Sequence, residues 1–487
     1  MKTKSTLLLG MIIGLSLNLS AQQRFSATAV GKRQSSSLNS HFSNYSLFSI
    51  PTQELASYAR GKQSQALDFE LELPGLDSWK FALTKHDILA GDYKLTMNTT
   101  AGPVQLRRPA CLTYAGRLTD GTNSLVSLTI DNHMIYGMIR SGEREYYIEP
   151  LNYIDNTEAS DLFVVYESKD VRIDPNLVCG VRETAERLNT LNRPSAGTNC
   201  VRTELAIASD ASMYTRYGSV YDVQVHNIGV MNNVIWSYVN GQFNDNIEFV
   251  IVAQNISTAT VADQLSPAYT GTNSNTILSN FRTWGQAGGF GVSYDLAQFW
   301  TTRNIDNDGA GGSAGIIGLA YVGAVCTNSR YHILEDYTGN NPTGSGYQLR
   351  VLTTHEIGHN FNCSHDAAGS GFIMAPSVGN TSTWSPASVA SVDAYVPGRA
   401  CLAACSAAGV PQTDFISSPE AVCTGFSLQL QDRTMGGPSS WAWTMAGGTP
   451  ASSVLRNPTV SFGTTGVKTI SLTASNVNGA GATVSKD

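Results

Sequence analysis

The feature that most constrains this chain is a short run from His355 to Asp366 that also contains His359 and His365. On a helix, His355 and His359 are four residues apart and share a face, so both imidazoles can reach one metal ion. His365 can return to that ion only if the helix ends and the chain turns. Asn362 lies where the turn is needed, and asparagine tolerates left-handed backbone. The run therefore predicts a helix, a tight turn and three histidines converging on zinc.

Glu356 is the acidic residue beside the first histidine. A carboxylate next to a metal-bound water can take its proton and pass it to a leaving amine, as peptide hydrolysis requires. Three protein ligands leave a fourth position open, which is typical of a catalytic zinc site. We therefore expect one catalytic Zn²⁺ bound by His355, His359 and His365, with Glu356 as general base. The alternative is a helix with incidental surface histidines, and the regular spacing of all three histidines argues against it.

Two other histidines are expected to be structural. His226 falls within a helical pattern and His332 in a loop-like stretch. Neither has a partner at ligand spacing, and an isolated histidine more often serves packing than metal binding.

The first residues have the pattern of a cleavable signal peptide. Two lysines precede an apolar run from Leu7 to about Leu19, and the small pair Ser20-Ala21 follows it. A membrane anchor is the alternative, but the run contains polar residues and is shorter than the roughly 20 residues that a bilayer core needs. We expect residues 1–21 to be removed and the rest to be secreted to the extracellular space, with no transmembrane segment. Disulfides persist there.

Charge excludes one class of partner. The net charge of −7 comes from 31 basic and 38 acidic residues spread along the chain, so no strong positive field collects nucleic acid. With 42% apolar and 14% charged residues, the 487-residue chain is typical of globular proteins and is long enough for about three domains.

The hydrophobic patterns divide the chain into three parts. Residues 22–198 contain alternating runs at 124–130 and 134–139 that indicate a β-rich unit. Residues 199–405 alternate strands with helices and so indicate an α/β domain. Residues 406–411 resemble a linker, and 412–487 alternate like a small β-sandwich, with Phe426, Leu428 and Leu430 on one strand. In the α/β part we expect strands at 203–208, 247–253, 294–300 and 316–325, and helices at 220–238 and 275–284.

A turn-rich stretch at 304–309 places Asp306 and Asp308 two residues apart. Two such carboxylates could bind Ca²⁺. Since the rest of a calcium loop is missing, a plain turn is the preferred interpretation.

The histidine run resembles that of the metzincins, and within them the adamalysin or reprolysin (ADAM-like) family. Asn362 stands where most of the family has glycine, although the thrombospondin-repeat branch also has asparagine. The resemblance covers about residues 200–402. It rests further on Asp366 directly after the third histidine, on Gly371-Phe372-Ile373-Met374-Ala375-Pro376, which is similar to a Met-turn, and on the upstream run 318–326, Gly-Leu-Ala-Tyr-Val-Gly-Ala-Val-Cys.

This resemblance implies a zincin-like catalytic domain that cleaves protein or peptide substrates, with Met374 in the turn below the zinc. It also implies that residues 318–322, including Gly318, Leu319 and Ala320, form an edge strand that binds substrate antiparallel through backbone groups. A Cys326–Cys401 disulfide is implied as well. The partners of the other cysteines outside the N-terminal part, Cys200, Cys363, Cys405 and Cys423, stay open.

The N-terminal part resembles the family's propeptide at 112–118 and 146–150, and Val178-Cys179-Gly180-Val181 resembles its cysteine switch. In that case the Cys179 thiolate would take the fourth zinc position, and the chain's own propeptide would be its inhibitor. The alternative is a disulfide between Cys179 and Cys111, the other cysteine of this part.

The last part resembles a PKD-type module of secreted bacterial hydrolases, through Pro450 and the stretches 439–443 and 457–462. It could bind glycan or protein, but a spacer is the preferred interpretation. The chain stops at what we interpret as the last strand, so we expect a further C-terminal region.

Together these patterns predict a secreted zinc-dependent endopeptidase made as a latent zymogen. The alternative is a secreted adhesin or binding protein with an inactive protease-like domain. The intact Glu356 argues against this alternative, because a domain without activity has no use for the base.

Overall fold

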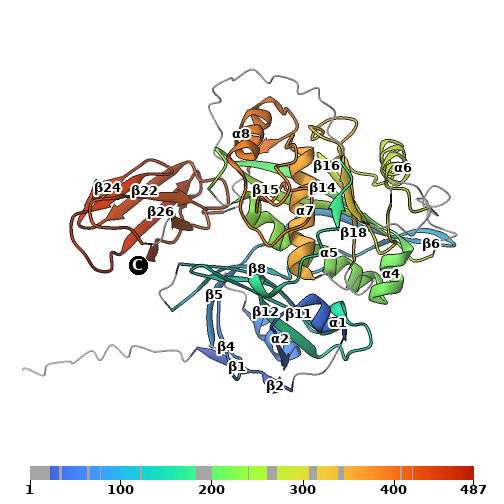
Figure 1. The fold of residues 1–487 in the computed structure, drawn as a ribbon, viewed down its shortest axis with the longest axis horizontal. Helices are drawn as coiled ribbons and strands as arrows, with labels where there is room; N and C mark the ends of the chain where they lie inside the picture. Colours follow the sequence, from blue (N-terminus) through green and yellow to red (C-terminus); the bar gives the residue numbers. More distant parts are fainter. Residues whose placement is uncertain are drawn as a thin grey trace, which may run out of the picture.

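The computed structural model describes residues 22–487 except 32–35, 63–65, 77, 121–122, 182–199, 240, 260–270, 307–314, 338–344, 406–408 and 419–420. Figure 1 shows a β-rich N-terminal part, a mixed α/β part above it and a β-rich C-terminal part to one side. The expected signal peptide lies outside the described residues. Within them, no helix has the length and apolar character needed to cross a membrane.

The N-terminal part is built on one ten-stranded sheet. Its hairpin of β9 (Ser124–Asp131) and β10 (Met134–Ser141) confirms the strands predicted from alternation. The other strands of the sheet are β1 (Gln23–Ser26), β2 (Thr28–Val30), β3 (Ser46–Ser49), β4 (Ala66–Glu72), β5 (Trp79–Lys85), β8 (Thr113–Leu118), β11 (Arg144–Pro150) and β12 (Leu162–Glu167). The helices are α1 (Ser36–His41), α2 (Thr52–Gly61), α3 (Leu151–Ile154) and the short η1 (Ser168–Asp170).

The α/β part has five strands in the order β17-β18-β16-β14-β15, all parallel except β17, which is antiparallel to β18. They are β14 (Cys200–Ser209), β15 (Asn246–Ser257), β16 (Leu296–Thr301), β17 (Ile316–Ala320) and β18 (Tyr331–Glu335). The helices are α4 (Ala211–Tyr217), α5 (Val220–Tyr238), α6 (Ser274–Gln286), α7 (Gly346–Asn360), α8 (Pro386–Tyr395) and η2 (Val396–Gly398). The predicted α/β alternation is confirmed.

Two local predictions in this part were wrong. The strand expected to reach residue 325 ends at Ala320, because the chain turns there and Gly323 adopts a left-handed conformation with φ of 62°. His332 lies inside β18 and is fully buried rather than in a loop. The five-residue strand β18 is buried throughout, so it lacks the alternation that would have revealed it.

The sheet of the α/β part also contains strands from the N-terminal part, and no sequence pattern had indicated this pairing. At one edge, β6 (Leu89–Thr99) pairs parallel with β15 and continues into β7 (Gly102–Leu106). At the other edge, β13 (Val178–Cys179) pairs parallel with β17. A short strand β19 (Ala403–Ala404) pairs with the start of β14.

The C-terminal part consists of two sheets around a core that includes Leu430, Trp443 and Leu472. Phe426 was expected on a strand but precedes β21 and is 69% exposed. The strands are β20 (Phe415–Ser418), β21 (Ser427–Asp432), β22 (Ser440–Met445), β23 (Gly448–Thr449), β24 (Ser452–Ser453), β25 (Thr459–Phe462), β26 (Ile470–Asn476), β27 (Gly479–Ala480) and β28 (Val484–Lys486).

Two disulfides are present. Cys326 is bonded to Cys401, as the resemblance implied, and Cys200 to Cys405. Cys111, Cys179, Cys363 and Cys423 are free thiols, so Cys111 and Cys179 are not bonded to each other.

Candidate metal centre

Helix α7 carries two of the three motif histidines and ends where the motif requires. The Ser345 hydroxyl caps its start by accepting from the Gln348 backbone N–H. After Asn360 the chain reverses through Asn362, whose φ of 75° is left-handed, and the Cys363 N–H donates to the Gly358 carbonyl at 2.9 Å. The predicted turn is confirmed, and it brings His365 back beside the helix.

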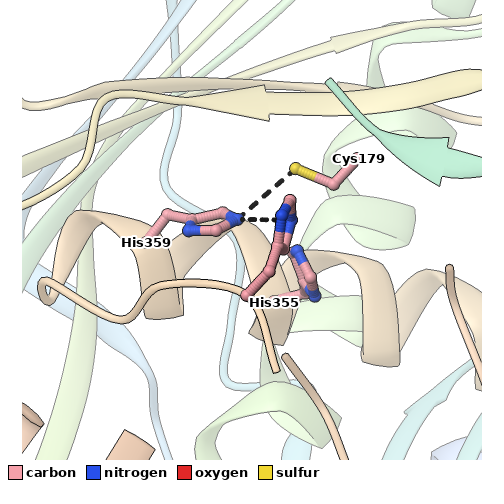
Figure 2. Close-up of side chains that lie close together, drawn as sticks. Cys179, His355 and His359 are labelled. Atoms are coloured by element: carbon pink, nitrogen blue, oxygen red, sulfur yellow. Dashed lines mark hydrogen bonds between the residues drawn. The ribbon is translucent and has the colours of Figure 1, made fainter. Parts of the chain in front are cut away.

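Four side chains converge beyond this turn. The ligand atoms of Cys179, His355, His359 and His365 all lie within 4.8 Å of one another. The Nε2 atoms of His359 and His365 are 3.2 Å apart, and Cys179 Sγ is 3.4 Å from His359 Nε2. Figure 2 shows the thiol pointing from its strand toward the imidazoles of the helix. Ligands of a tetrahedral zinc, at 2.0–2.3 Å from it, are separated from each other by about 3.3–3.6 Å, so this cluster has the spacing of a common site.

Backbone carbonyls orient two of the imidazoles. His355 Nδ1 lies 2.7 Å from the Ile373 carbonyl, and His359 Nδ1 lies 2.8 Å from the Cys363 carbonyl. A carbonyl only accepts, so each Nδ1 carries the proton and each Nε2 presents a lone pair. Among the residues that the structure describes, buried His355 Nε2 has no hydrogen-bond partner. An unpaired buried nitrogen is costly, and a bound cation would satisfy it.

Burial also sets the protonation of these histidines. It lowers the pKa of His355 to about 3 and that of His359 well below its usual value. Both imidazoles are therefore neutral at physiological pH, the form that binds metals. The donor set and its protonation fit zinc.

Glu356 lies between α7 and β17, fully buried, and neither carboxylate oxygen has a hydrogen-bond partner among the described residues. Burial raises its pKa to about 8. Its carboxylate fits against the bare Cα of Gly318, where an added Cβ would overlap Oε1 and lie 2.8 Å from Cδ. Gly318 therefore creates the space that the acidic side chain occupies.

Met374 lies beneath the helix and is fully buried. Its sulfur packs against Gly358, where an added Cβ would be only 2.6 Å away. The Asp366 N–H donates to the Met374 carbonyl at 2.8 Å, and the Asp366 carboxylate accepts from Ser385, the N-cap of α8. The stretch after the third histidine thus ties the turn at Met374 to the helix that follows.

The strand β17, which contains Gly318, Leu319 and Ala320, was expected to be a free edge. Instead, residues 178–180 cover it: the Gly180 N–H donates to the Gly318 carbonyl at 2.9 Å. On the opposite side of this segment the Cys179 N–H donates to the Pro376 carbonyl at 2.9 Å. The segment therefore lies between β17 and the chain that follows the turn at Met374.

Cys179 is the residue that this segment places at the cluster. Its side chain is 8% exposed, and the Val181 N–H donates to its sulfur at 3.4 Å. Burial raises the pKa of the thiol well above its usual value, and the nearby Glu356 raises it further. A thiolate at this position would therefore require a cation beside it.

The remaining candidates lie elsewhere. His226 Nε2 is 3.5 Å from Asp336 Oδ2, and His332 contacts Asn360 and Gln298 at 2.8 and 3.1 Å, so both belong to buried polar networks as expected. Of the considered calcium pair, Asp308 lies outside the described residues. Asp306 is buried and accepts from the Thr272 hydroxyl at 2.7 Å. No finding supports calcium there.

Comparison with known families agrees with this geometry. Residues 201–396 match a reprolysin-type model described as metallo-peptidase family M12. The matched range contains α7, the three histidines, Glu356 and Met374. The match supports a metallopeptidase of the metzincin type, and family M12 is zinc-dependent.

Proposed function

We propose that this chain is a secreted zinc endopeptidase made as a latent precursor. The observation that carries the proposal is the buried Nε2 of His355, which has no hydrogen-bond partner among the described residues, beside two further imidazoles and the buried Glu356 carboxylate. In the proposal, His355, His359 and His365 hold the zinc and Met374 supports them from below. Zinc, when bound, would polarise the substrate carbonyl and acidify a water molecule.

Glu356 supplies the proton transfers. Its carboxylate lies on the side of α7 that faces β17, where the scissile peptide would lie. It takes a proton from the attacking water and gives it to the leaving amine nitrogen. Packing against Gly318 restricts its position, which is how a general base is kept within reach of its proton.

Protein substrates are favoured by the walls of the cleft. The cleft is here the space between β17 and the chain at Pro376 that residues 178–180 fill. The Gly318 carbonyl on one side and the Pro376 carbonyl on the other already accept backbone hydrogen bonds from this extended segment. A substrate that replaced this segment would form the same type of backbone hydrogen bonds, with Gly318, Leu319 and Ala320 on one side.

Latency follows from the segment that now fills the cleft. Cys179 would take the fourth zinc position and exclude water. The segment runs parallel to β17, opposite to the antiparallel direction we expect for substrate, so its peptide bonds are presented in reverse.

We assign residues 22–198 to the propeptide, 1–21 to the signal peptide, 199–405 to the catalytic domain and 412–487, after the linker 406–411, to a PKD-type module. Two disulfides are compatible with secretion.

The test is Glu356→Ala, compared with wild type after proteolytic release of the segment around Cys179. The base is not a zinc ligand, so zinc per chain should stay at the wild-type level while chelator-sensitive casein hydrolysis falls by roughly 10²–10⁴-fold. Wild-type zinc content with no hydrolysis in either protein would instead favour the adhesin with an inactive protease-like domain.

A further inference from the structure

The N-terminal part contacts the catalytic domain through two segments of different character. The first, residues 22–171, is called here the N-terminal β-domain. The second, residues 172–181, is called the inhibitory segment. The stretch 182–199, which connects the inhibitory segment to β14, lies outside the described residues.

The N-terminal β-domain shares a hydrophobic core with the catalytic domain. Helix α5 contacts β15 and α7 on one side and β8, β9 and β10 on the other. Of its 19 residues, all but Tyr221 and Asp222 are buried. One continuous cluster contains Tyr136, Met138 and Tyr147 of the β-domain together with the apolar residues of α5. A helix at the surface of a domain keeps one polar face toward water, and α5 lacks one.

Specific polar contacts join the same surfaces. The Ser127 hydroxyl donates to the Asn232 carbonyl at 3.0 Å, and the Asn232 amide donates back to the Leu128 carbonyl at 3.2 Å. Gly229 lets α5 approach Tyr136 so closely that an added Cβ would lie 2.9 Å from the ring. These groups are buried, so separation would leave them to be rehydrated.

The β-domain also caps and pairs with the metal-site helix. The Glu149 carboxyl oxygens accept from the Gly346 N–H at 3.1 Å, at the start of α7. Glu145 lies between Arg140, at 2.8 Å, and Arg350 of α7, at 3.6 Å. Glu145, Glu149 and Arg350 are all buried.

Two further contacts hold the β-domain from other directions. Strand β6 adds to the catalytic sheet along the edge of β15 (Figure 1). The C-terminal part bonds to both neighbours: the Lys486 amine donates to Asn123 of the β-domain at 3.2 Å, and the Asn246 amide of β15 donates to the Thr434 carbonyl at 3.0 Å.

The inhibitory segment, by contrast, is narrow and partly exposed. It contacts the cleft through the backbone of residues 178–180 and the Cys179 side chain. Beside the cleft, Leu177 is buried in the shared core, and the Gln348 side chain of α7 donates to the Arg172 carbonyl at 3.3 Å. Arg172, Pro175 and Asn176, which join it to the β-domain, are exposed. These residues are accessible to a protease, whereas the β-domain interface is not.

We propose that the N-terminal β-domain remains bound as a noncovalent subunit after the chain is cut within 182–199, and that a second cut within 172–176 is what opens the cleft. The inference rests on the proposed function. After the first cut, the inhibitory segment is still attached to a bound β-domain, so its effective concentration at the cleft stays high. Only the second cut turns it into a short peptide that diffuses away.

The experiment places recognition sequences for a site-specific protease in the full chain. One variant carries the sequence within 182–199, a second carries another between Pro175 and Asn176, and a third carries both. Association is measured by size-exclusion chromatography in the Glu356→Ala background, in which self-cleavage is removed, with uncut protein as control. Chelator-sensitive peptide hydrolysis is measured with Glu356 intact.

We expect the two fragments of the singly cut protein to coelute and to separate only in denaturant, with hydrolysis at the level of the uncut chain. The doubly cut protein should keep the β-domain and gain at least 10-fold in hydrolysis. Separation of the fragments after one cut, or full hydrolysis after the cut within 182–199 alone, would overturn the proposal. If the doubly cut protein retains the β-domain but hydrolyses nothing, the subunit interface is supported and the proposed peptidase function fails.

Discussion

The inhibitory segment and the N-terminal β-domain are parts of one region, yet they meet the catalytic domain in opposite ways. The segment reaches the cleft through backbone hydrogen bonds and one thiol, and exposed residues flank it. The β-domain shares a core with α5 and places two buried carboxylates against α7. Displacement of the segment would therefore uncover little of the core, chiefly Leu177, whereas removal of the β-domain would expose the core that it shares with α5.

We therefore expect the inhibitory segment to block the cleft and the β-domain to stabilise the fold. A change at the metal site should affect hydrolysis and leave the β-domain in place. A change at the β-domain interface should affect stability and leave the metal ligands in place. The following substitutions test each half of the comparison.

The largest effect is expected for His365→Ala, which changes the cleft alone. Loss of one of three imidazole ligands should reduce zinc from about one per chain to well below half and abolish chelator-sensitive hydrolysis. Zinc is measured by elemental analysis of purified protein. His332→Gln is the control, because His332 is a buried histidine that hydrogen-bonds to Asn360 and Gln298 and is not part of the metal-site cluster, so this variant should retain zinc. Full zinc content in His365→Ala would contradict the ligand assignment.

Glu145→Gln is expected to change the interface alone. Burial opposes ionisation of Glu145, but Arg350 and Arg140 outweigh it and hold its pKa at about 2. Loss of the charge leaves two arginines without their partner and should destabilise the precursor by about 3 kcal/mol. Thermal unfolding compares it with Glu143→Gln, an exposed neighbour that should behave like wild type. Equal melting temperatures would contradict the contact.

The contact between Glu145 and Arg350 also predicts that the stability of the precursor depends on pH. The folded pKa of Glu145, about 2, lies below its ordinary value of 4.5. The contribution of ionised Glu145 to the free energy of unfolding is therefore complete above pH 4.5 and is lost as the pH falls toward 2. The difference in stability between wild type and Glu145→Gln should shrink over this range.

A smaller effect is expected for Gly318→Ala, which disturbs the base and not the ligands. An added Cβ would displace the Glu356 carboxylate, and a shift of about 1 Å can cost roughly 100-fold in rate. Zinc content should not change. Gly379→Ala is the control: an added Cβ would meet no atom of another residue within 4 Å, so the rate of hydrolysis should stay at the wild-type level. Hydrolysis by Gly318→Ala at the wild-type rate would show that Glu356 is not positioned by this packing.

Features encoded in short stretches of sequence could be predicted. The spacing of His355, His359 and His365, and Asn362 at the turn, depend on local geometry, and the structure brings these histidines together. Helices α5 and α6 of the α/β part follow from helical periodicity, and its buried strands from short apolar runs such as that of β17. Strand β18 was missed because His332 and Glu335 interrupt its apolar run.

The contacts between the parts could not be predicted. Glu149 and Gly346 are 197 residues apart, and nothing in the sequence near either indicates the other. Pairing of β6 with β15 likewise depends on which sheet edge is free in the folded domain. Pairings of this kind are decided by the packing of whole domains, so they leave no periodic signal.

The most direct test of the central claim, that Cys179 blocks a catalytic zinc site, is the activity of the uncut precursor with Cys179→Ser. Cys111→Ser is the control, since Cys111 is also a free thiol but is not part of the metal-site cluster. We expect chelator-sensitive peptide hydrolysis by uncut Cys179→Ser and none by uncut wild type or Cys111→Ser, because loss of the Zn–S bond admits water. A folded, zinc-loaded Cys179→Ser precursor that hydrolyses no more peptide than uncut wild type would contradict the claim that Cys179 blocks the site.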